Sequence, residues 1–347
     1  MDAKNRNQNY FSIIIISYNQ EKYIKDAILS AFNQNFNNYE IIISDDCSTD
    51  NTWNIINETV AKEKNKRDIS TCLNRNENNL GIVRNYQKAL SLTKGNWIVA
   101  SAGDDISKPN RLQVISSLVI ANKNIFAIGT GFDLINESGG YISKNNPCIK
   151  KEINLPLYPG FSAAINRDTF TKFPNILENI QSEDIIYTLR AFELGKIILT
   201  NTSIVKHRIH SNNITSKGTS SKAYIGKILN HENAIKTLNY YKNNELQNEK
   251  LIPIIDRQIK KFEENIKHYE FITFYYKMNL LKKILNFSKI KLPVEHRNFY
   301  NFLYRIKIFC ESYNISKIEK IYFLLKSYKK ELSSKKDKLQ KIKTYYI

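Results

Sequence analysis

The sequence has few cysteines and no apolar run long enough to cross a membrane. Its 347 residues include only 4 cysteines, scattered without paired spacing (Cys47, Cys72, Cys148, Cys310). This scatter argues against a disulfide framework or a zinc site and favours a reducing compartment. No apolar run approaches the roughly 18 residues of a transmembrane helix. The polar segment 1–9 lacks a signal-peptide core. We therefore expect a cytoplasmic location.

Two common nucleotide-binding motifs are also missing. No Gly-x-Gly-x-x-Gly follows the first apolar run, residues 10–17, which argues against a dinucleotide-binding Rossmann site. No Gly-Lys-Ser or Gly-Lys-Thr occurs, which excludes a P-loop NTPase on motif grounds. The hydrophobic content of 42% and aromatic content of 12% exclude a disordered chain. The length fits roughly two domains.

Acidic residues are scarce in the C-terminal part of the chain. Residues 221–347 hold 27 Lys plus Arg against 12 Asp plus Glu, a net charge of +15 out of the formal +19 for the whole chain. Such a basic region fits an anionic membrane face, a polyanionic substrate or nucleic acid. A Lys- and Asn-rich composition that merely solvates helices explains the charge equally well. Glycine does not occur after Gly226, and long apolar periodicities predict helices there.

Strand and helix patterns alternate over the first 110 residues. Strands are expected at 10–17, 39–44, 69–73 and 96–100, and helices at 21–33, 48–60 and 82–92. Alternation with short connections predicts a parallel sheet covered by helices on both faces. Ligands bind such sheets at the carboxyl ends of the strands.

Two pairs of adjacent acids end two of these strands. Asp45 and Asp46 follow the second strand, and Asp104 and Asp105 follow the fourth. Because neighbouring carboxylates repel each other, a cation should offset them, and hard oxygen ligands suit Mg²⁺ or Mn²⁺. The alternative is that these acids only cap the helices that follow.

A third acid pair, Glu183 and Asp184, stands at the start of a predicted helix capped by Ser182. Acids in a first helical turn also interact favourably with the helix dipole, so a purely structural role is open. Further on, His210 stands in the segment Arg208-Ile209-His210. A lone histidine is more often structural than catalytic.

Four stretches resemble a known family. They are residues 14–20 (IIISYNQ), 40–52 (EIIISDDCSTDNT), 79–81 (NLG) and 103–105 (GDD). In this order and spacing they resemble the family-2 inverting glycosyltransferases with the GT-A fold, of the bacterial surface-polysaccharide type. The resemblance covers about residues 10–215 and departs from the family at Cys47, where glycine is commoner. It implies a Rossmann-like, mostly parallel sheet covered by helices in a domain 1–220, followed by a basic α-helical region 221–347.

The resemblance also implies an activity. The family transfers a sugar from a nucleotide sugar to a hydroxyl, here a hexose or N-acetylhexosamine from a UDP-sugar. The acceptor would be a glycan or a lipid-linked molecule in the synthesis of capsule, lipopolysaccharide or lipooligosaccharide. The enzyme would be cytoplasmic, with a peripheral location on the inner face of the membrane where Tyr322–Lys330 could lie. No nucleic-acid partner is expected.

Residue roles follow from the same resemblance. The implied nucleotide-binding residues are Ser17, Tyr18, Asn19, Asp45, Asp46, Arg84 and Asp104. Among them, Tyr18 would lie against the nucleobase, Asp46 would accept a hydrogen bond from the uracil edge, and Asp104 would face the ribose. Asp105 and His210 would hold the divalent metal, Mn²⁺ or Mg²⁺. Asp184 would be the catalytic base, and Glu183 would orient it or the acceptor.

Two alternative functions stay open. A sugar nucleotidyltransferase would share the strand-end acids, but such enzymes usually carry a glycine-rich loop after the first strand, and residues 17–20 contain no glycine. A nucleic-acid-binding protein would explain the basic half of the chain. That half shows no recognisable nucleic-acid-binding motif.

Overall fold

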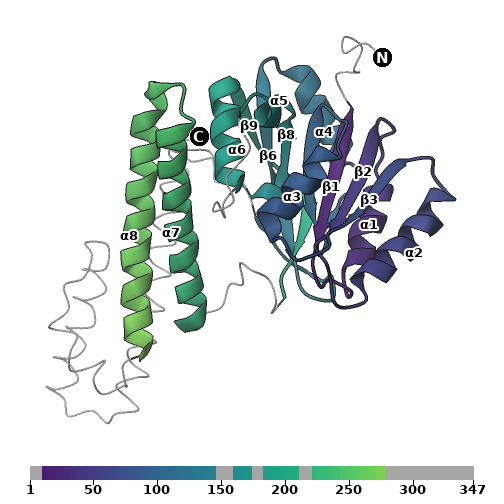
Figure 1. The fold of residues 1–347 in the computed structure, drawn as a ribbon, viewed down its shortest axis with the longest axis horizontal. Coiled ribbons are helices and arrows are strands. Elements are labelled where there is room, and N and C mark those ends of the chain that lie inside the picture. Colours follow the sequence, from purple (N-terminus) through teal and green to yellow (C-terminus); the bar gives the residue numbers. More distant parts are fainter. Residues whose placement is uncertain (1–9, 146–158, 174–182, 211–220, 278–347) are drawn as a thin grey trace, which may run out of the picture. The chain divides into compact units, whose positions relative to one another are not determined.

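The computed structural model describes residues 10–145, 159–173, 183–210 and 221–277. The chain divides into two compact units, residues 1–218 with 226–266 and residues 219–225 with 267–347. The first unit contains the sheet, the helices that cover it, and the greater part of helices α7 (Ser221–Asn244) and α8 (Ile252–Lys277) (Figure 1). Ser182, the segment 211–220 and the helices expected after residue 277 lie outside the described residues. No described helix combines the length and the apolar character that a membrane crossing requires.

Nine strands form one sheet in the order β3-β2-β1-β4-β8-β6-β9-β5, and β7 pairs with β6. Their bounds are Phe11–Ser17 (β1), Tyr39–Asp45 (β2), Ser70–Arg75 (β3), Trp97–Ala102 (β4), Ile106–Ser107 (β5), Ile125–Ile135 (β6), Tyr141–Asn145 (β7), Ala163–Asn166 (β8) and Lys196–Arg208 (β9). The four N-terminal strands are parallel, as expected. Beyond β4 the sheet becomes mixed, because β8 runs antiparallel to both β4 and β6. The predicted α/β class is therefore confirmed, with a mixed sheet in place of a mostly parallel one.

The remaining elements connect and cover these strands. The helices are α1 (Ile24–Phe32), α2 (Thr52–Lys64), α3 (Ile82–Ser91), α4 (Arg111–Ala121), α5 (Asp168–Thr171) and α6 (Glu183–Leu194), with short 3₁₀ helices η2 (Gly160–Ser162) and η3 (Glu249–Leu251). Helix α2 begins four residues later than the earliest start expected from the sequence. Its first turn is held by Asp50, whose carboxylate accepts the Thr52 N–H at 3.0 Å.

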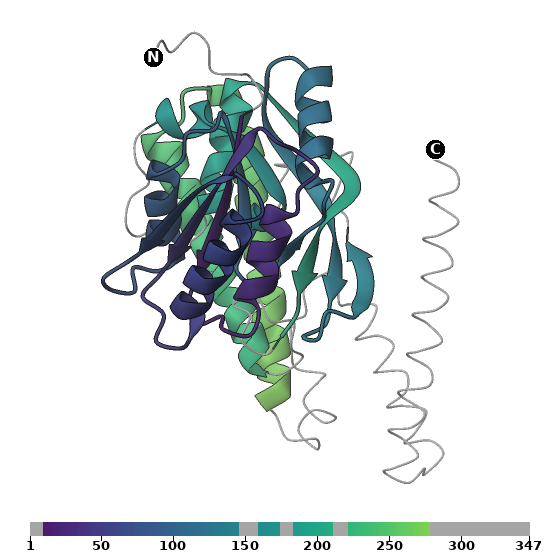
Figure 2. The same ribbon diagram turned by 90° about the vertical axis from the view of Figure 1, so that its right-hand side faces the viewer.

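The strand pattern divides the core between the two faces of the sheet. Because successive side chains of a strand point to opposite faces, Ile13 and Ile15 pack on one side of β1 and Ile14 packs on the other. The first face is covered by α1, α2 and α4, and Figure 2 shows α1 (purple) and α2 (dark blue) lying side by side. The second face is covered by α3 and α6, with α7 and α8 packing into the same cluster. The central strands β1 and β2 are thus buried on both faces.

Strand register brings the acid pairs to one edge of the sheet. Ser17 is level with Asp45 across β1 and β2, and Ile16 is level with Ala102 across β1 and β4. The turns that leave β2 and β4 therefore begin next to each other at the carboxyl ends of parallel strands. This is the edge at which open α/β sheets bind ligands.

Candidate active site

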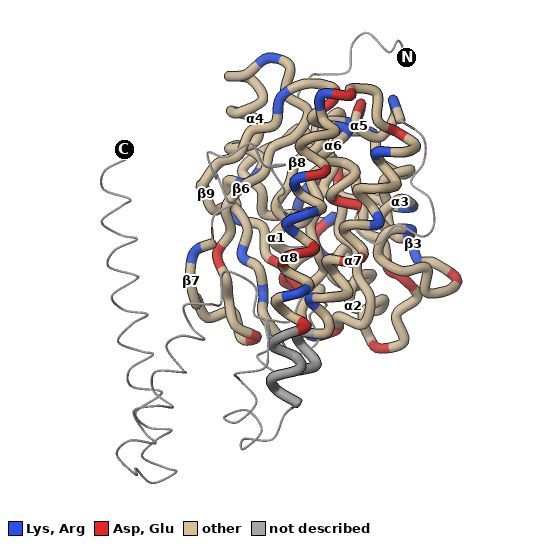
Figure 3. Tube along the Cα trace, turned by 90° about the vertical axis from the view of Figure 1, so that its left-hand side faces the viewer, with Lys and Arg blue, Asp and Glu red and all other residues tan. Residues whose placement is uncertain are grey.

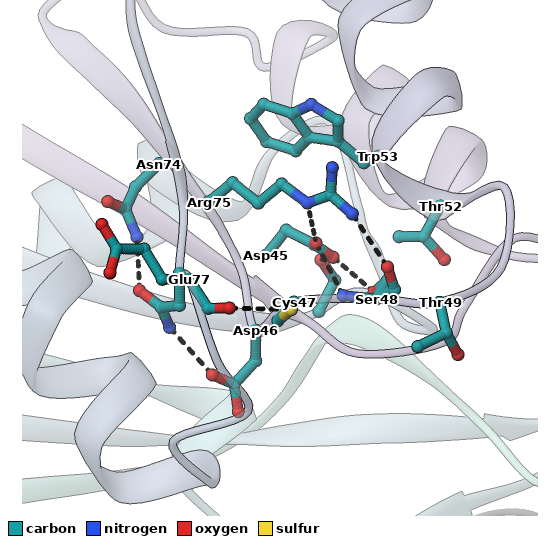
Figure 4. Close-up of polar contacts among 12 residues, drawn as sticks. Asp45, Asp46, Cys47, Ser48, Thr49, Thr52, Trp53, Asn74, Arg75 and Glu77 are labelled. Carbon is teal, nitrogen blue, oxygen red and sulfur yellow. Dashed lines mark hydrogen bonds and ion pairs between the residues drawn. The ribbon is translucent and has the colours of Figure 1, made fainter.

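The first acid of the β2 pair, Asp45, is fully buried and holds its own loop together (Figure 4). Its carboxylate accepts hydrogen bonds from the hydroxyls of Ser17 and Ser48 and from the Ser48 N–H at 3.0 Å. Arg75 Nε lies 3.6 Å from the same carboxylate, and the Arg75 guanidinium lies over the Trp53 ring. Asp45 and Ser17, both expected to contact nucleotide, therefore bond to protein groups and shape the loop that follows β2.

The second acid, Asp46, holds the loop that leads into α3. One carboxylate oxygen accepts Asn76 Nδ2 at 2.8 Å and the Leu80 N–H at 2.9 Å, and the other accepts the Gly81 N–H at 2.8 Å. Gly81 has φ +82°, a left-handed conformation that glycine adopts without strain. A carboxylate offers about four acceptor positions, and these bonds occupy three of them. Asp46, expected to contact uracil, thus also holds the loop before α3 in place.

The other expected nucleotide contacts lie around this edge. Tyr18 is 45% exposed, which leaves its ring available to stack on a base. Asn19 has φ +51° and its amide oxygen accepts the Thr49 N–H at 2.8 Å, so it ties the β1 turn to the β2 loop. Arg84 is exposed in the first turn of α3. Cys47, at φ +60°, adopts the conformation for which the family's commoner glycine is suited.

Asp104 and Asp105 follow β4 in a tight turn. Space at Gly103 is limited, because a Cβ there would lie 3.1 Å from Ser17 Cβ and would displace the end of the Gln20 side chain. Asp105 is fully buried, and its Oδ1 accepts the Arg208 N–H at 3.0 Å and lies 2.9 Å from His207 Nδ1. Burial raises the pKa of Asp105, and the hydrogen bond with His207 opposes that rise. The end of β9 thus holds Asp105 in place.

His210 lies beside the other acid of this pair. Its Nε2 lies 3.0 Å from Asp104 Oδ2, and its ring stacks on Tyr23 with centroids 4.7 Å apart. The Arg208 guanidinium lies over the other ring of the stack, 5.0 Å from the centre of Tyr23. Burial and a hydrogen bond to Glu137 raise the pKa of Tyr23 to about 12, so its ring stays neutral. The structure therefore places His210 beside Asp104, whereas the histidine beside Asp105 is His207.

The residues at this turn fit a hard divalent cation. Asp105 Oδ2 is buried and has no hydrogen-bond partner among the described residues. Such an oxygen is costly to leave unpaired. Within the described ranges no three His, Cys, Asp or Glu side chains form a ready metal cluster. Mg²⁺ and similar ions are commonly held by one or two carboxylates together with substrate phosphates, so Asp105 with a diphosphate ligand would suffice.

The third acid pair opens α6. Glu183 and Asp184 are partly buried, and Asp184 Oδ1 accepts the Ile185 N–H at 2.9 Å. Burial raises the pKa of Glu183 to about 8, with a further contribution from the charge of Asp184. Burial also raises the pKa of Asp184 to about 6. Both acids therefore hold a proton more tightly than an exposed carboxyl does, and a carboxylate with a raised pKa suits a general base near neutral pH.

A short segment connects this pair to the β4 turn. At Gly160 in η2, an added Cβ would lie 3.8 Å from Asp184 Cβ. The next residue, Phe161, stacks on His207 with ring centroids 4.3 Å apart and 9° between the planes. The Phe161 carbonyl accepts Arg111 Nη2 at 2.8 Å. Segment 160–162 therefore spans from Asp184 to the histidine that holds Asp105.

Three supporting residues were missed in the sequence. His207 stands three residues before His210 and directly before Arg208, so the same stretch that pointed to His210 could also have pointed to His207. Tyr23 and Arg111 carry no motif. The fully buried guanidinium of Arg111 bonds to carbonyls at Ala100 and Phe161, and such contacts appear only once the chain is folded.

Comparison with known proteins gives a family match and distant relatives. The model of glycosyl transferase family 2 matches residues 12–192. An uncharacterized glycosyltransferase of Haemophilus influenzae is 27% identical over 246 residues, 66% of this chain and 74% of that protein. The poly(ribitol-phosphate) beta-N-acetylglucosaminyltransferase TarS of Staphylococcus aureus is 28% identical over 52% of this chain and 32% of its own length. The putative teichuronic acid biosynthesis glycosyltransferase TuaG of Bacillus subtilis is 30% identical over 38% of this chain and 50% of its own.

Two solved structures share the fold. TarS residues 1–349 in complex with UDP-GlcNAc align with a TM-score of 0.53 and 18% identity, over 80% of this chain and 79% of that one. The mannosyltransferase PcManGT of Pyrobaculum calidifontis, in complex with GDP-Man and Mn²⁺, aligns with a TM-score of 0.56 and 13% identity, over 84% and 83%. Both are glycosyltransferases, and their likeness to this chain is one of fold.

Proposed function

Because the chain belongs to glycosyl transferase family 2, we propose that it transfers a hexose or N-acetylhexosamine from a UDP-sugar to a hydroxyl group with inversion. The acceptor is a glycan or lipid-linked molecule in the synthesis of a bacterial surface polysaccharide. The names of TarS and TuaG, which concern wall polymers, support this acceptor class.

One observation carries the proposal. Two separate carboxylate systems, Asp104 with Asp105 and Glu183 with Asp184, are joined through segment 160–162. Inverting transfer needs a base on the acceptor hydroxyl and stabilisation of the leaving diphosphate. An ionised Asp184 beside a protonated Glu183 meets the first need, and a cation-binding turn at Asp105 meets the second.

The roles of the chain's own residues follow. Asp184 removes the proton of the acceptor hydroxyl as that oxygen attacks the anomeric carbon, the bond from this carbon to the diphosphate oxygen breaks, and UDP leaves with the electron pair. Glu183 keeps its proton and orients the acceptor. Asp105, together with His210, holds a divalent cation, which when bound supplies positive charge to the diphosphate. Asp104 orients the ribose, and Tyr18 and Asp46 hold the base.

Uracil is the base that we favour for the donor nucleotide. Asp46 keeps one acceptor position for the N3–H of uracil. The two fold neighbours bind different donors, UDP-GlcNAc and GDP-Man, so the fold accommodates either base. The nucleotidyltransferase alternative has weaker support, because residues 17–20 lack glycine and the family match is to transferases of sugars.

A donor screen tests this function. The purified chain is incubated with UDP-glucose, UDP-galactose, UDP-GlcNAc, UDP-GalNAc and GDP-mannose, and release of nucleoside diphosphate is measured with Mn²⁺ or with EDTA. We expect turnover of a UDP-sugar that EDTA removes and Mn²⁺ restores. Preference for GDP-mannose would contradict the uridine assignment, and the absence of any turnover, with no binding of UDP by calorimetry, would contradict the proposed function.

A further inference from the structure

Helix α6 carries a buried ion pair at a distance from its two acids. Arg190 is 1% exposed, and its Nε and Nη2 both lie 2.8 Å from Glu245 Oε2. Among the ion pairs of the described residues, it has the most completely buried partners, with side-chain exposures of 2% and 0%. Glu245 directly follows α7, and its N–H donates to the Tyr241 carbonyl at 2.9 Å. The pair therefore links α6 to the end of α7; Figure 1 shows the two helices next to each other.

A buried ion pair of this kind is poorly explained by stability alone. Removing two charges from water offsets much of their attraction, and well-packed apolar residues often stabilise such a site as well. Around this pair lie the tyrosines Tyr240 and Tyr241, whose pKa values are raised by burial and by the nearby carboxylates of Glu245 and Glu193. A directional contact retained under these conditions points to control of geometry.

The Arg190–Glu245 contact lies on the same face of α6 as Glu183. Three side chains recur along this face at positions i, i+4 and i+7 of the helix: Glu183, Tyr187 and Arg190. The Arg190 guanidinium lies 6.0 Å from the centre of the Tyr187 ring, and the charge of Glu183 contributes to the raised pKa of Tyr187. Tyr187 in turn packs on Phe170 with centroids 4.6 Å apart. One face of the helix thus connects the ion pair to the acids.

Rotation of the helix would move those acids. Because side chains project radially from a helix, a turn of α6 about its axis would redirect the carboxyl of Asp184, whose Cβ lies near Gly160 of η2. The Arg190–Glu245 contact holds the helix about two turns farther along. Together with the packing of α6 against the sheet, this contact limits the rotation.

We propose that Arg190 and Glu245 are positioning residues for Glu183 and Asp184, so that the end of α7 helps to orient the acids. The inference rests on the proposed function, because it concerns the geometry of the proposed base. It assigns residues 226–245 a part in the transfer step, although they lie beyond the family match at 12–192.

The test separates positioning from stability. The full-length variants are Glu245→Gln, which leaves Arg190 buried without its anionic partner, and the double variant Arg190→Met with Glu245→Leu, which fills the site with apolar side chains. Asp256→Asn is the matched control, since it breaks the exposed pair Lys242–Asp256 between α7 and α8. Each protein is measured for melting temperature, affinity for UDP, kcat, and hydrogen exchange of the α6 amides.

For Glu245→Gln we expect kcat at least tenfold lower, UDP affinity within twofold of the unmodified chain, and faster exchange at amides 185–189. The double variant should regain the melting temperature of the unmodified chain while kcat stays low, and Asp256→Asn should change none of these quantities more than twofold. Recovery of kcat together with melting temperature in the double variant would overturn the proposal, as would unchanged exchange in α6. Hydrogen exchange does not depend on catalysis, so failure of the proposed function would be recognised separately, by inactivity of the unmodified chain.

Discussion

At the scale of single residues, Asp184 is the group on which the proposed proton transfer depends. Replacing it with Asn keeps its size and its acceptor oxygen for the Ile185 N–H. Because a general base contributes about 10²–10⁴-fold to such a step, we expect Asp184→Asn to lower kcat by that factor while UDP affinity is unchanged. Steady-state kinetics and calorimetry measure both quantities. Asp168→Asn, at a half-exposed acid paired with Lys172, is the control and should keep full activity.

The same residue predicts a pH dependence. Asp184 must be ionised to accept a proton, and burial raises its pKa to about 6. We therefore expect kcat/KM to rise with pH through about 6 in the unmodified chain, and this limb to disappear in Asp184→Asn. A profile that keeps its acid limb in the variant would assign the base to another residue.

Asp105 is the second residue with a direct test. In Asp105→Asn an acceptor oxygen for the Arg208 N–H is retained, but the buried anionic oxygen is lost. We expect affinity for Mn²⁺ in the presence of UDP to fall at least about tenfold, the lower range for changes at a metal site. Titration followed by electron paramagnetic resonance measures it without relying on activity. The control is Asp68→Asn at an exposed acid before β3, and equal Mn²⁺ affinity in all three proteins would exclude a metal at Asp105.

At the scale of elements, the ionisation of Glu183 at the start of α6 should lower the free energy of unfolding as the pH rises. Glu183 has a pKa of about 8 in the folded chain against an ordinary value of 4.5. A carboxyl that binds its proton more tightly when folded makes the free energy of unfolding fall as pH rises from 4.5 to 8. Below pH 4.5 both states are protonated and the effect vanishes.

The corresponding variant is Glu183→Gln, which removes this titration. We expect it to raise the free energy of unfolding at pH 8.5 by at least about 1 kcal/mol, or about 2–4 °C in melting temperature, and to leave it unchanged at pH 4.5. Thermal unfolding followed by circular dichroism at the two pH values checks this. A gain of equal size at both pH values would show that packing, and not the charge of Glu183, is responsible.

At the scale of the whole molecule, charge is distributed unevenly along the chain. Along the described parts of α7 and α8, basic and acidic positions both occur (Figure 3). Residues 221–277 contain 10 Lys plus Arg and 7 Asp plus Glu, whereas residues 278–347 contain 17 against 5. Most of the C-terminal excess of +15 therefore belongs to residues 278–347, outside the described part.

We predict that this basic region binds anionic membranes. Each Lys or Arg near an anionic surface contributes about 1 kcal/mol, so several must act together. The full chain should float with vesicles containing phosphatidylglycerol at low salt, and less with neutral vesicles or at 0.5 M salt. Changing Lys326, Lys329 and Lys330 to Gln should reduce recovery on anionic vesicles. Equal recovery on both lipids would exclude an electrostatic mechanism.

The sequence by itself determined the elements of the N-terminal sheet and the edge at which its acids gather. Continuous apolar runs such as residues 13–16 are typical of strands buried on both faces, and short connections through helices favour parallel neighbours. Because all such strands end at one edge, Asp46, Asp104 and Asp105 could be grouped before any coordinates existed. Local pattern and chain connectivity were sufficient for this part.

Only the tertiary structure decided how those acids are held. His207 meets Asp105 across 102 residues of sequence, and Arg190 meets Glu245 across 55. No local pattern records such pairs, because they depend on how β9 and α7 pack against elements formed much earlier in the chain. The different environments of Asp45, bonded within its own loop, and of Asp105, with one buried oxygen unpartnered, follow from the same packing. Burial and hydrogen bonding, which set what a carboxylate can do, are properties of the folded chain.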